Sequence, residues 1–199
     1  ISVLNCSITR CSGSSGIYNS KHCMFANNKF YNNSGTLNIH NDSSYNAVTS
    51  NIFTQNRSGM SCEGAYNTIN NNTFESNDRY ALTLSTGGHN IVNGNSFMAN
   101  GIETGNYYAQ LETSAESSNN AIQNNIFRRG TQTNKPKYGI AIISSTCVNN
   151  LVSNNDCYTG GETAGISGAG TNTNFGAGNR NNDGYPGSKG SAYCSKGNL

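Results

Sequence analysis

Two glutamates are the carboxylates best placed for acid–base chemistry in this sequence. Hydrolysis of a glycosidic bond uses two carboxyl groups, about 5 Å apart in retaining enzymes and about 6.5–9.5 Å apart in inverting ones. The chain has 10 acidic residues, and none of them forms an Asp-Asp or Asp-x-Asp pair. Glu112 and Glu103 are the candidate catalytic pair, because both fall in one irregular region of the chain. The alternative is that both are solvated surface carboxylates.

Aromatic and cationic side chains gather in the same region. Four of the 12 basic residues fall between positions 128 and 137. Tyrosine rings pack against sugar rings, while guanidinium and ammonium groups bind carboxylate, sulfate or phosphate. The candidate substrate-binding residues are Tyr107, Tyr108, Arg128, Arg129, Lys135, Lys137 and Tyr138. Two alternatives remain: the tyrosines pack their loops onto the fold while the cations stay solvated, or these residues form an oligomer contact.

No residue cluster in the sequence indicates a metal ion or a cofactor. The histidines His22, His40 and His89 do not share a position in the repeat described below, so we expect no metal site. The glycines suit turns, because no glycine-rich stretch follows a strand and opens a helix. We therefore expect no cofactor.

The seven cysteines are an odd number, which argues against a complete disulfide framework. Cys62 and Cys157 occupy positions that are apolar in other units, where a thiol behaves as a small buried side chain. We expect free, packed thiols. A Cys6–Cys23 or a Cys11–Cys23 bridge is the alternative.

Composition excludes several classes of function. The 199 residues carry a net charge of +2 and only 11% charged side chains, without the basic surface of a nucleic-acid binder. No apolar run approaches the length of about 18 residues that would indicate a membrane span. The 36 asparagines and 23 glycines suit turns and corners.

One apolar position returns at short intervals and reveals an internal repeat. The anchors of the repeat are Ile8, Phe30, Phe53, Phe74, Phe97, Phe127 and Cys157. They are separated by 22, 23, 21, 23, 30 and 30 residues. Another apolar residue stands five positions before each anchor, and asparagines recur seven and two positions before it and three after it. Periods of about 20–50 residues are typical of solenoids and related repeat architectures.

Each unit contains three short strands separated by corners rich in Asn or Gly. A third apolar pair follows the anchor after a turn, as in Leu37/Ile39 and Leu82/Leu84. Three short strands cannot bury an apolar face alone, but stacked coils bury it against their neighbours. We therefore predict an all-β fold, a single-stranded parallel β-helix or solenoid of about seven coils of three short strands. Asn suits the corners because it tolerates left-handed backbone angles, and its amide can stack from coil to coil.

Two consecutive units carry insertions at the same corner. The segment Met98–Ala109 follows one anchor and Arg128–Tyr138 follows the next. Stacked coils would place the two loops side by side, with Glu112 between them. In solenoids, insertions collect on one face, which is often the binding face.

The repeated pattern N-x-[IV]-x-N-N-x-F-x-x-N, followed by G-[IL]-x-[IL], resembles the parallel β-helix repeat of the pectin-lyase-like superfamily. The resemblance covers about residues 1–167 and implies a right-handed coil and a carbohydrate ligand. Lyases, glycoside hydrolases, mannuronan C5-epimerases, carbohydrate-binding proteins and phage tailspikes or appendages share this repeat. The signature motifs of the pectate lyases, polygalacturonase-like hydrolases and epimerases are missing here, apart from a Gly88-His89-Asn90 fragment.

We expect two regions, a parallel β-helix at residues 1–167 and an irregular Gly/Asn-rich cap or further module at 168–199, where Tyr185-Pro186-Gly187 indicates a turn. Open ends of a solenoid expose strand edges, so we expect neighbouring domains or the other chains of a homotrimer to cover them. The resemblance favours a polysaccharide-binding module of tailspike or appendage type, with or without depolymerase activity, on a virion surface or secreted. The alternatives are a lyase, hydrolase or epimerase acting on an acidic glycan, and a structural rod.

Overall fold

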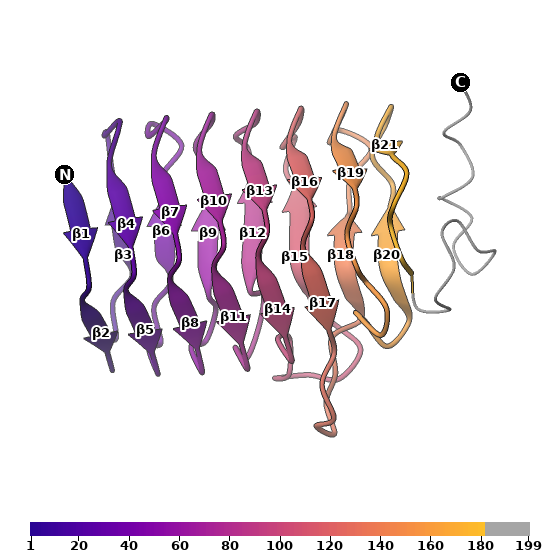
Figure 1. Ribbon diagram of the computed structural model, residues 1–199, viewed down its shortest axis with the longest axis horizontal. Coiled ribbons are helices and arrows are strands. Elements are labelled where there is room, and N and C mark those ends of the chain that lie inside the picture. The colour runs from indigo at the N-terminus through magenta and orange to yellow at the C-terminus, as the bar shows by residue number, and fades with distance from the viewer. Residues whose placement is uncertain (182–199) are drawn as a thin grey trace.

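The computed structural model describes residues 1–181, and every regular element in that part of the chain is a β-strand. The strands form three parallel sheets that run the length of a rod (Figure 1). Consecutive strands of the chain lie in different sheets, and each strand pairs with its equivalents in the coils before and after. This arrangement is the single-stranded parallel β-helix that the sequence predicts.

The strand boundaries follow the repeat. The first sheet has eight strands, β1 (Ser2–Leu4), β4 (Met24–Ala26), β7 (Ala47–Thr49), β10 (Thr68–Asn70), β13 (Ile91–Asn93), β16 (Ala121–Gln123), β19 (Leu151–Ser153) and β21 (Asn174–Phe175). The second has six, β2 (Ser7–Thr9), β5 (Lys29–Tyr31), β8 (Ile52–Thr54), β11 (Thr73–Glu75), β14 (Ser96–Met98) and β17 (Ile126–Arg128). The third has seven, β3 (Ser15–Ile17), β6 (Leu37–Ile39), β9 (Met60–Cys62), β12 (Leu82–Ser85), β15 (Ala109–Ser114), β18 (Tyr138–Ile142) and β20 (Ala164–Gly168).

A column of phenylalanines forms the centre of the core. The anchors pair in the predicted register, for example Phe53 with Phe74 and Phe74 with Phe97. From Phe30 to Phe127, successive ring centroids lie 4.4–4.9 Å apart and the rings are nearly parallel. The coil spacing of a parallel sheet, about 4.8 Å, therefore sets the ring spacing as well.

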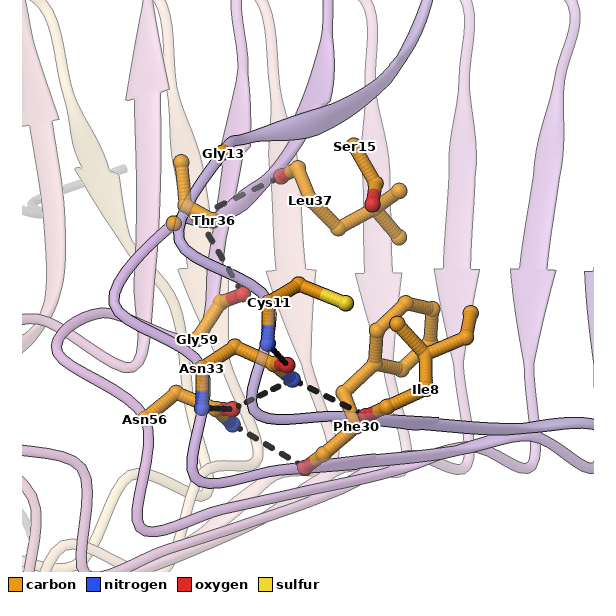
Figure 2. Close-up of a pocket in the computed structure, with 11 residues that line it drawn as sticks. Ile8, Cys11, Gly13, Ser15, Phe30, Asn33, Thr36, Leu37, Asn56 and Gly59 are labelled. Carbon is orange, nitrogen blue, oxygen red and sulfur yellow. Dashed lines mark hydrogen bonds between the residues drawn. The ribbon is translucent and has the colours of Figure 1, made fainter.

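Asparagine ladders hold the three corners. We name the corners by the strands that precede them: the first corner follows the first sheet, the second corner the second sheet, and the third corner the third sheet. At the first corner, the Asn72 side chain donates to the Val48 carbonyl (2.9 Å) and to Asn95 Oδ1 (3.0 Å), and accepts from the Asn51 backbone N–H (2.9 Å). Figure 2 shows the same pattern at the second corner, where Asn33 and Asn56 stack. Each buried amide satisfies backbone groups that the corner leaves unpaired.

The β-helix continues beyond residue 167, where the sequence predicted its end. β21 pairs with β19, placing Phe175 beside Val152 in the core column of the first sheet. Asn179 then extends the first-corner ladder by accepting from Asn155 (3.0 Å). The sequence does not reveal this last part of the β-helix, because few apolar residues follow Gly168. The predicted Tyr185-Pro186-Gly187 turn lies outside the described residues.

Within residues 1–181, Cys6, Cys11, Cys23, Cys62 and Cys147 are free thiols, and the last three are buried, whereas Cys6 and Cys11 are exposed rather than packed. Neither the Cys6–Cys23 nor the Cys11–Cys23 bridge forms. Cys62 is fully buried on the third sheet, and this burial raises the pKa of its thiol to about 12. Cys157 is buried in the anchor position, as predicted, whereas Cys194 lies outside the described part of the chain.

Candidate functional site

The two inserted loops lie side by side, as the sequence predicts. Backbone hydrogen bonds run from Asn106 N to Lys135 O (2.9 Å) and from Lys137 N to Tyr108 O (2.7 Å). The segment after β19 joins them, because Glu162 N donates to the Pro136 carbonyl (2.8 Å). The three segments form a wall that leaves the rod between the second and third sheets (Figure 1). We call this feature the loop wall.

Three tyrosines pack together where the first loop meets the rod. The Tyr108 ring makes edge contacts with Tyr80 at 5.0 Å and with Tyr107 at 4.7 Å between centroids. The Tyr107 side chain is 65% exposed, so its ring is available to a ligand. The Tyr108 hydroxyl donates to Glu103 Oε2 at 3.0 Å, and Arg79 Nε contacts the same oxygen at 2.6 Å. Tyr80 and Arg79 precede β12 and were not among the predicted site residues.

Glu112 and Glu103 lie at opposite ends of this tyrosine contact. Glu112 projects from β15, half-buried, between Thr83 and Ala141 of the neighbouring coils. Its carboxyl group is hydrogen-bonded to Tyr80, and burial raises its pKa. The same burial, together with the Glu112 charge, raises the pKa of Tyr80 to about 12. The two glutamates are therefore linked through Tyr80 and Tyr108.

Arg128 is bound to the rod. Its Nη2 lies 2.5 Å from Asp156 Oδ2, and its Nη1 donates to the carbonyl of Phe127 at 2.8 Å and to that of Asp156 at 3.1 Å. Asp156 occupies the next coil, so the ion pair joins the coil that carries the second insertion to the coil that follows it. The Arg128 guanidinium thus has a structural partner within the rod, which the sequence did not reveal.

The other predicted cations and Tyr138 belong to the loop wall. Lys137 Nζ lies 5.3 Å from the centroid of the Tyr138 ring, a cation–π geometry. The Arg129 backbone N–H donates to the Thr159 carbonyl (2.7 Å), and the Lys135 carbonyl accepts the loop-to-loop bond from Asn106. All four side chains are half-buried. Within residues 1–181, Arg129, Lys135 and Lys137 form no ion pair.

A polar groove of about 370 Å³ runs along the second corner to the loop wall. Its lining residues are Arg10, Cys11, Ser12, Asn32, Asn33, Ser34, Gln55, Arg57, Asp78 and Glu103. Arg10 and Arg57 have no ion-pair partner in the described part of the chain, so their guanidinium groups are available to a ligand. Glu103 belongs both to the groove and to the loop wall, which makes the two features one continuous surface. We call the groove and the loop wall together the candidate site.

Sequence reasoning missed the groove because its charges follow no repeat. The corner position of Arg57 and Asp78, four residues after the anchor, is Ser12 and Ser34 in earlier coils. The sequence feature that could have revealed the groove is the low number of charged residues in the chain. In a chain with 11% charged residues, Arg57 and Asp78 share one corner position in adjacent coils.

Two carboxylates of the groove have pKa values shifted in opposite directions. Asp78 is exposed at the surface, but partial desolvation raises the pKa of its carboxyl group, and repulsion from Glu103 raises it further. The hydrogen bond from Arg79 lowers the pKa of Glu103, and the Tyr108 hydroxyl adds to this effect. The Glu103 backbone N–H donates to the Asp78 carbonyl at 2.7 Å, so the residues lie in neighbouring coils of the corner. The Asp78 carboxyl group therefore keeps its proton to a higher pH than an ordinary aspartate, and the Glu103 carboxyl group loses its proton at a lower pH than an ordinary glutamate.

A much smaller cavity of about 10 Å³ lies inside the first coil (Figure 2). It exists because Ile8 replaces phenylalanine, and Ser15 stands where Leu37 fills the next coil. This volume holds about one water molecule, so it is a packing gap and no ligand site.

No group of three or more His, Cys, Asp or Glu side chains within residues 1–181 could hold a metal ion. The expectation that the histidines share no repeat position is wrong for two of them. His22 and His89 occupy one column of the third corner. In the same described range, no helix is long and apolar enough to cross a membrane.

Comparison with known proteins supports the fold. A family model described as a right-handed β-helix region matches residues 1–97 of the chain. A search of curated proteins found no match. Together with the three stacked parallel sheets, the family match establishes a right-handed parallel β-helix.

Proposed function

We propose that this protein binds a polysaccharide in the candidate site, as a β-helical module of tailspike or appendage type on a virion surface or in a secreted protein. Right-handed β-helices often bind or process polysaccharides, and the family match supports that general assignment. The candidate site carries the specific proposal. Its groove has the volume of a ligand site and is lined by amide, hydroxyl and guanidinium groups, which pair with sugar hydroxyls.

The loop wall supplies the aromatic part of the binding surface. Tyr107 exposes its ring beside the groove, and Tyr108 is fixed by Tyr80 and Glu103. Rings held in one orientation lose little entropy when a sugar packs against them. Arg10 and Arg57 at the other end favour a glycan that carries carboxylate, sulfate or phosphate groups.

A glycan array followed by calorimetry with the best binder tests this proposal. Arg57→Ser in the groove and Tyr107→Ala in the loop wall should each weaken binding about tenfold or more. Lys29→Ser is the matched control, because Lys29 is exposed on β5 outside the candidate site. Equal affinities for the control and the two site variants would overturn the proposal.

Glycan cleavage is the second candidate function, and the Asp78–Glu103 pair favours it. Asp78, with its raised pKa, would protonate the leaving glycosidic oxygen, and the Glu103 carboxylate would accept a proton from the attacking water. Glu112 would then support the wall through Tyr80. New reducing ends after incubation with the best-binding glycan would support cleavage, and Asp78→Asn and Glu103→Gln should abolish them. Unsaturated uronates would indicate a lyase instead.

A further inference from the structure

Four aromatic side chains stack on the outside of the third corner, away from the candidate site. Ring centroids lie 5.6 Å apart from His22 to Tyr45, 5.1 Å from Tyr45 to Tyr66 and 4.8 Å from Tyr66 to His89. The two tyrosines are 49% and 47% exposed. We call these four residues the aromatic ladder. Its rings cover one another's faces, so the ladder presents ring edges outward.

The ladder residues adopt a backbone conformation that aromatic residues rarely take. Their φ angles are +58° for His22 and Tyr45, +59° for Tyr66 and +57° for His89. The following coils place Asn119 and Asn149 in the same column with the same φ. Asn tolerates this conformation with less strain than an aromatic residue does. Strain that the fold itself could avoid points to a function for the rings.

A second row of side chains runs beside the ladder on the first sheet. Two positions after each ladder residue stand, in coil order, Met24, Ala47, Thr68 and Ile91, which pair in register. Met24 and Ile91 are exposed, whereas Ala47 and Thr68 are small and half-buried. We call this the flanking row.

The two rows are complementary in size within every coil. The large Tyr45 and Tyr66 rings stand beside the small residues Ala47 and Thr68. The smaller His22 and His89 rings stand beside the long Met24 and Ile91 side chains. None of the eight positions is Asp, Glu, Lys or Arg, and the net charge of the chain is only +2. Charge repulsion therefore does not oppose self-association.

We propose that this strip is the interface of a parallel two-fold dimer of the chain. A two-fold axis parallel to the rod places the ladder of one copy against the flanking row of the other, coil by coil. Tyr45 of each copy then covers Ala47 of the other, and Tyr66 covers Thr68. Because both copies share one coil spacing, the match repeats along the strip without adjustment. Such self-complementarity is the condition for an isologous interface.

Sedimentation velocity on the whole chain tests the dimer. The wild-type chain should sediment as a dimer. The double variant Tyr45→Asn with Tyr66→Asn should associate about tenfold or more weakly. It installs the residue that the column uses in later coils, so at concentrations where both chains are monomeric its thermal midpoint should equal or exceed that of the wild type. Tyr107→Asn, in the loop wall, is the matched control and should leave the dimer intact.

A knob-and-hole exchange distinguishes this interface from a general effect of surface tyrosines. Ala47→Tyr alone fills the hole and should give monomers. Ala47→Tyr combined with Tyr45→Asn moves the knob and the hole to each other's positions and should restore the dimer. A wild-type monomer or trimer, a dimer that survives in the Tyr45/Tyr66 double variant, or a failed rescue would overturn the proposal. None of these results depends on glycan binding.

Discussion

The side-chain oxygen of Gln110 accepts hydrogen bonds from both nitrogens of Asn100, at 3.3 Å from the backbone N–H and 3.1 Å from Nδ2. Asn100 is the last asparagine of the second-corner ladder, because the next coil has Gly130 at that position. Gln110 Nε2 then donates to the carbonyls of Arg128 (3.1 Å) and Gly160 (2.7 Å). One buried glutamine thus ends the ladder and ties the loop wall to the rod.

Gln110→Ala should destabilise the protein by about 3 kcal/mol or more, since it leaves several buried polar groups without partners. Chemical unfolding of the variant and the wild type measures the difference. Gln132→Ala is the matched control, because Gln132 only donates to the Arg129 carbonyl within its own loop. If both variants lose a similar free energy of unfolding, Gln110 has no special role in linking the loop wall to the rod.

The neighbouring residues Asn71 and Asn72 should differ strongly in how much stability they lose on the same substitution. Asn72→Asp replaces a buried donor with a carboxylate that meets Asn95 Oδ1 and the Val48 carbonyl, and we expect a loss of about 3 kcal/mol. Asn71 is exposed with a φ of +56°, which Asp tolerates, so Asn71→Asp should change stability by less than about 0.5 kcal/mol. The unfolding midpoints of the two variants, each compared with that of the wild type, measure this difference in stability. A tolerated Asn72→Asp would contradict a structural role for the ladder.

The stability that Glu112 contributes should fall as the pH rises. Burial raises the pKa of its carboxyl group in the folded protein above the ordinary value of 4.5. The protonated form is therefore favoured by folding, and its contribution is present below pH 4.5 and lost as the pH passes the raised pKa. Glu112→Gln should match the wild type in acid and be more stable at neutral pH. Thermal midpoints between pH 4 and pH 8 test this, and parallel curves would refute it.

Asp78 and Glu103 should titrate as interacting neighbours. Carbon-detected NMR should place the pKa of Asp78 above 3.8 and that of Glu103 below 4.5. Because Glu103 repels the ionised Asp78, Glu103→Gln should lower the pKa of Asp78. Glu75→Gln, an exposed change on β11, is the control. If the pKa of Asp78 is the same in Glu103→Gln as in the wild type, the two carboxyl groups do not interact, and the basis for acid–base chemistry in the groove is lost.

The core and the corners could be predicted because they repeat. Phe53, Phe74 and Phe97 must stack at one interval, and this interval also fixes where the two insertions meet. The role of Arg128 could not be predicted, since its partner Asp156 lies 28 residues away in the next coil. The groove residues Arg57 and Asp78 share no residue type with earlier coils, so nothing in the repeat marks them. Charged residues at the corners form a site only because stacking of the coils brings residues from neighbouring coils together.

The most direct test of the central claim is to map the bound glycan on the protein by NMR. With the best binder from the array, we expect chemical-shift changes at Arg10, Arg57 and Tyr107, along the second corner and the loop wall. Signals of Tyr66 on the aromatic ladder serve as the internal reference and should not move. Changes centred on the ladder, with an unaltered second corner, would contradict the proposed binding site.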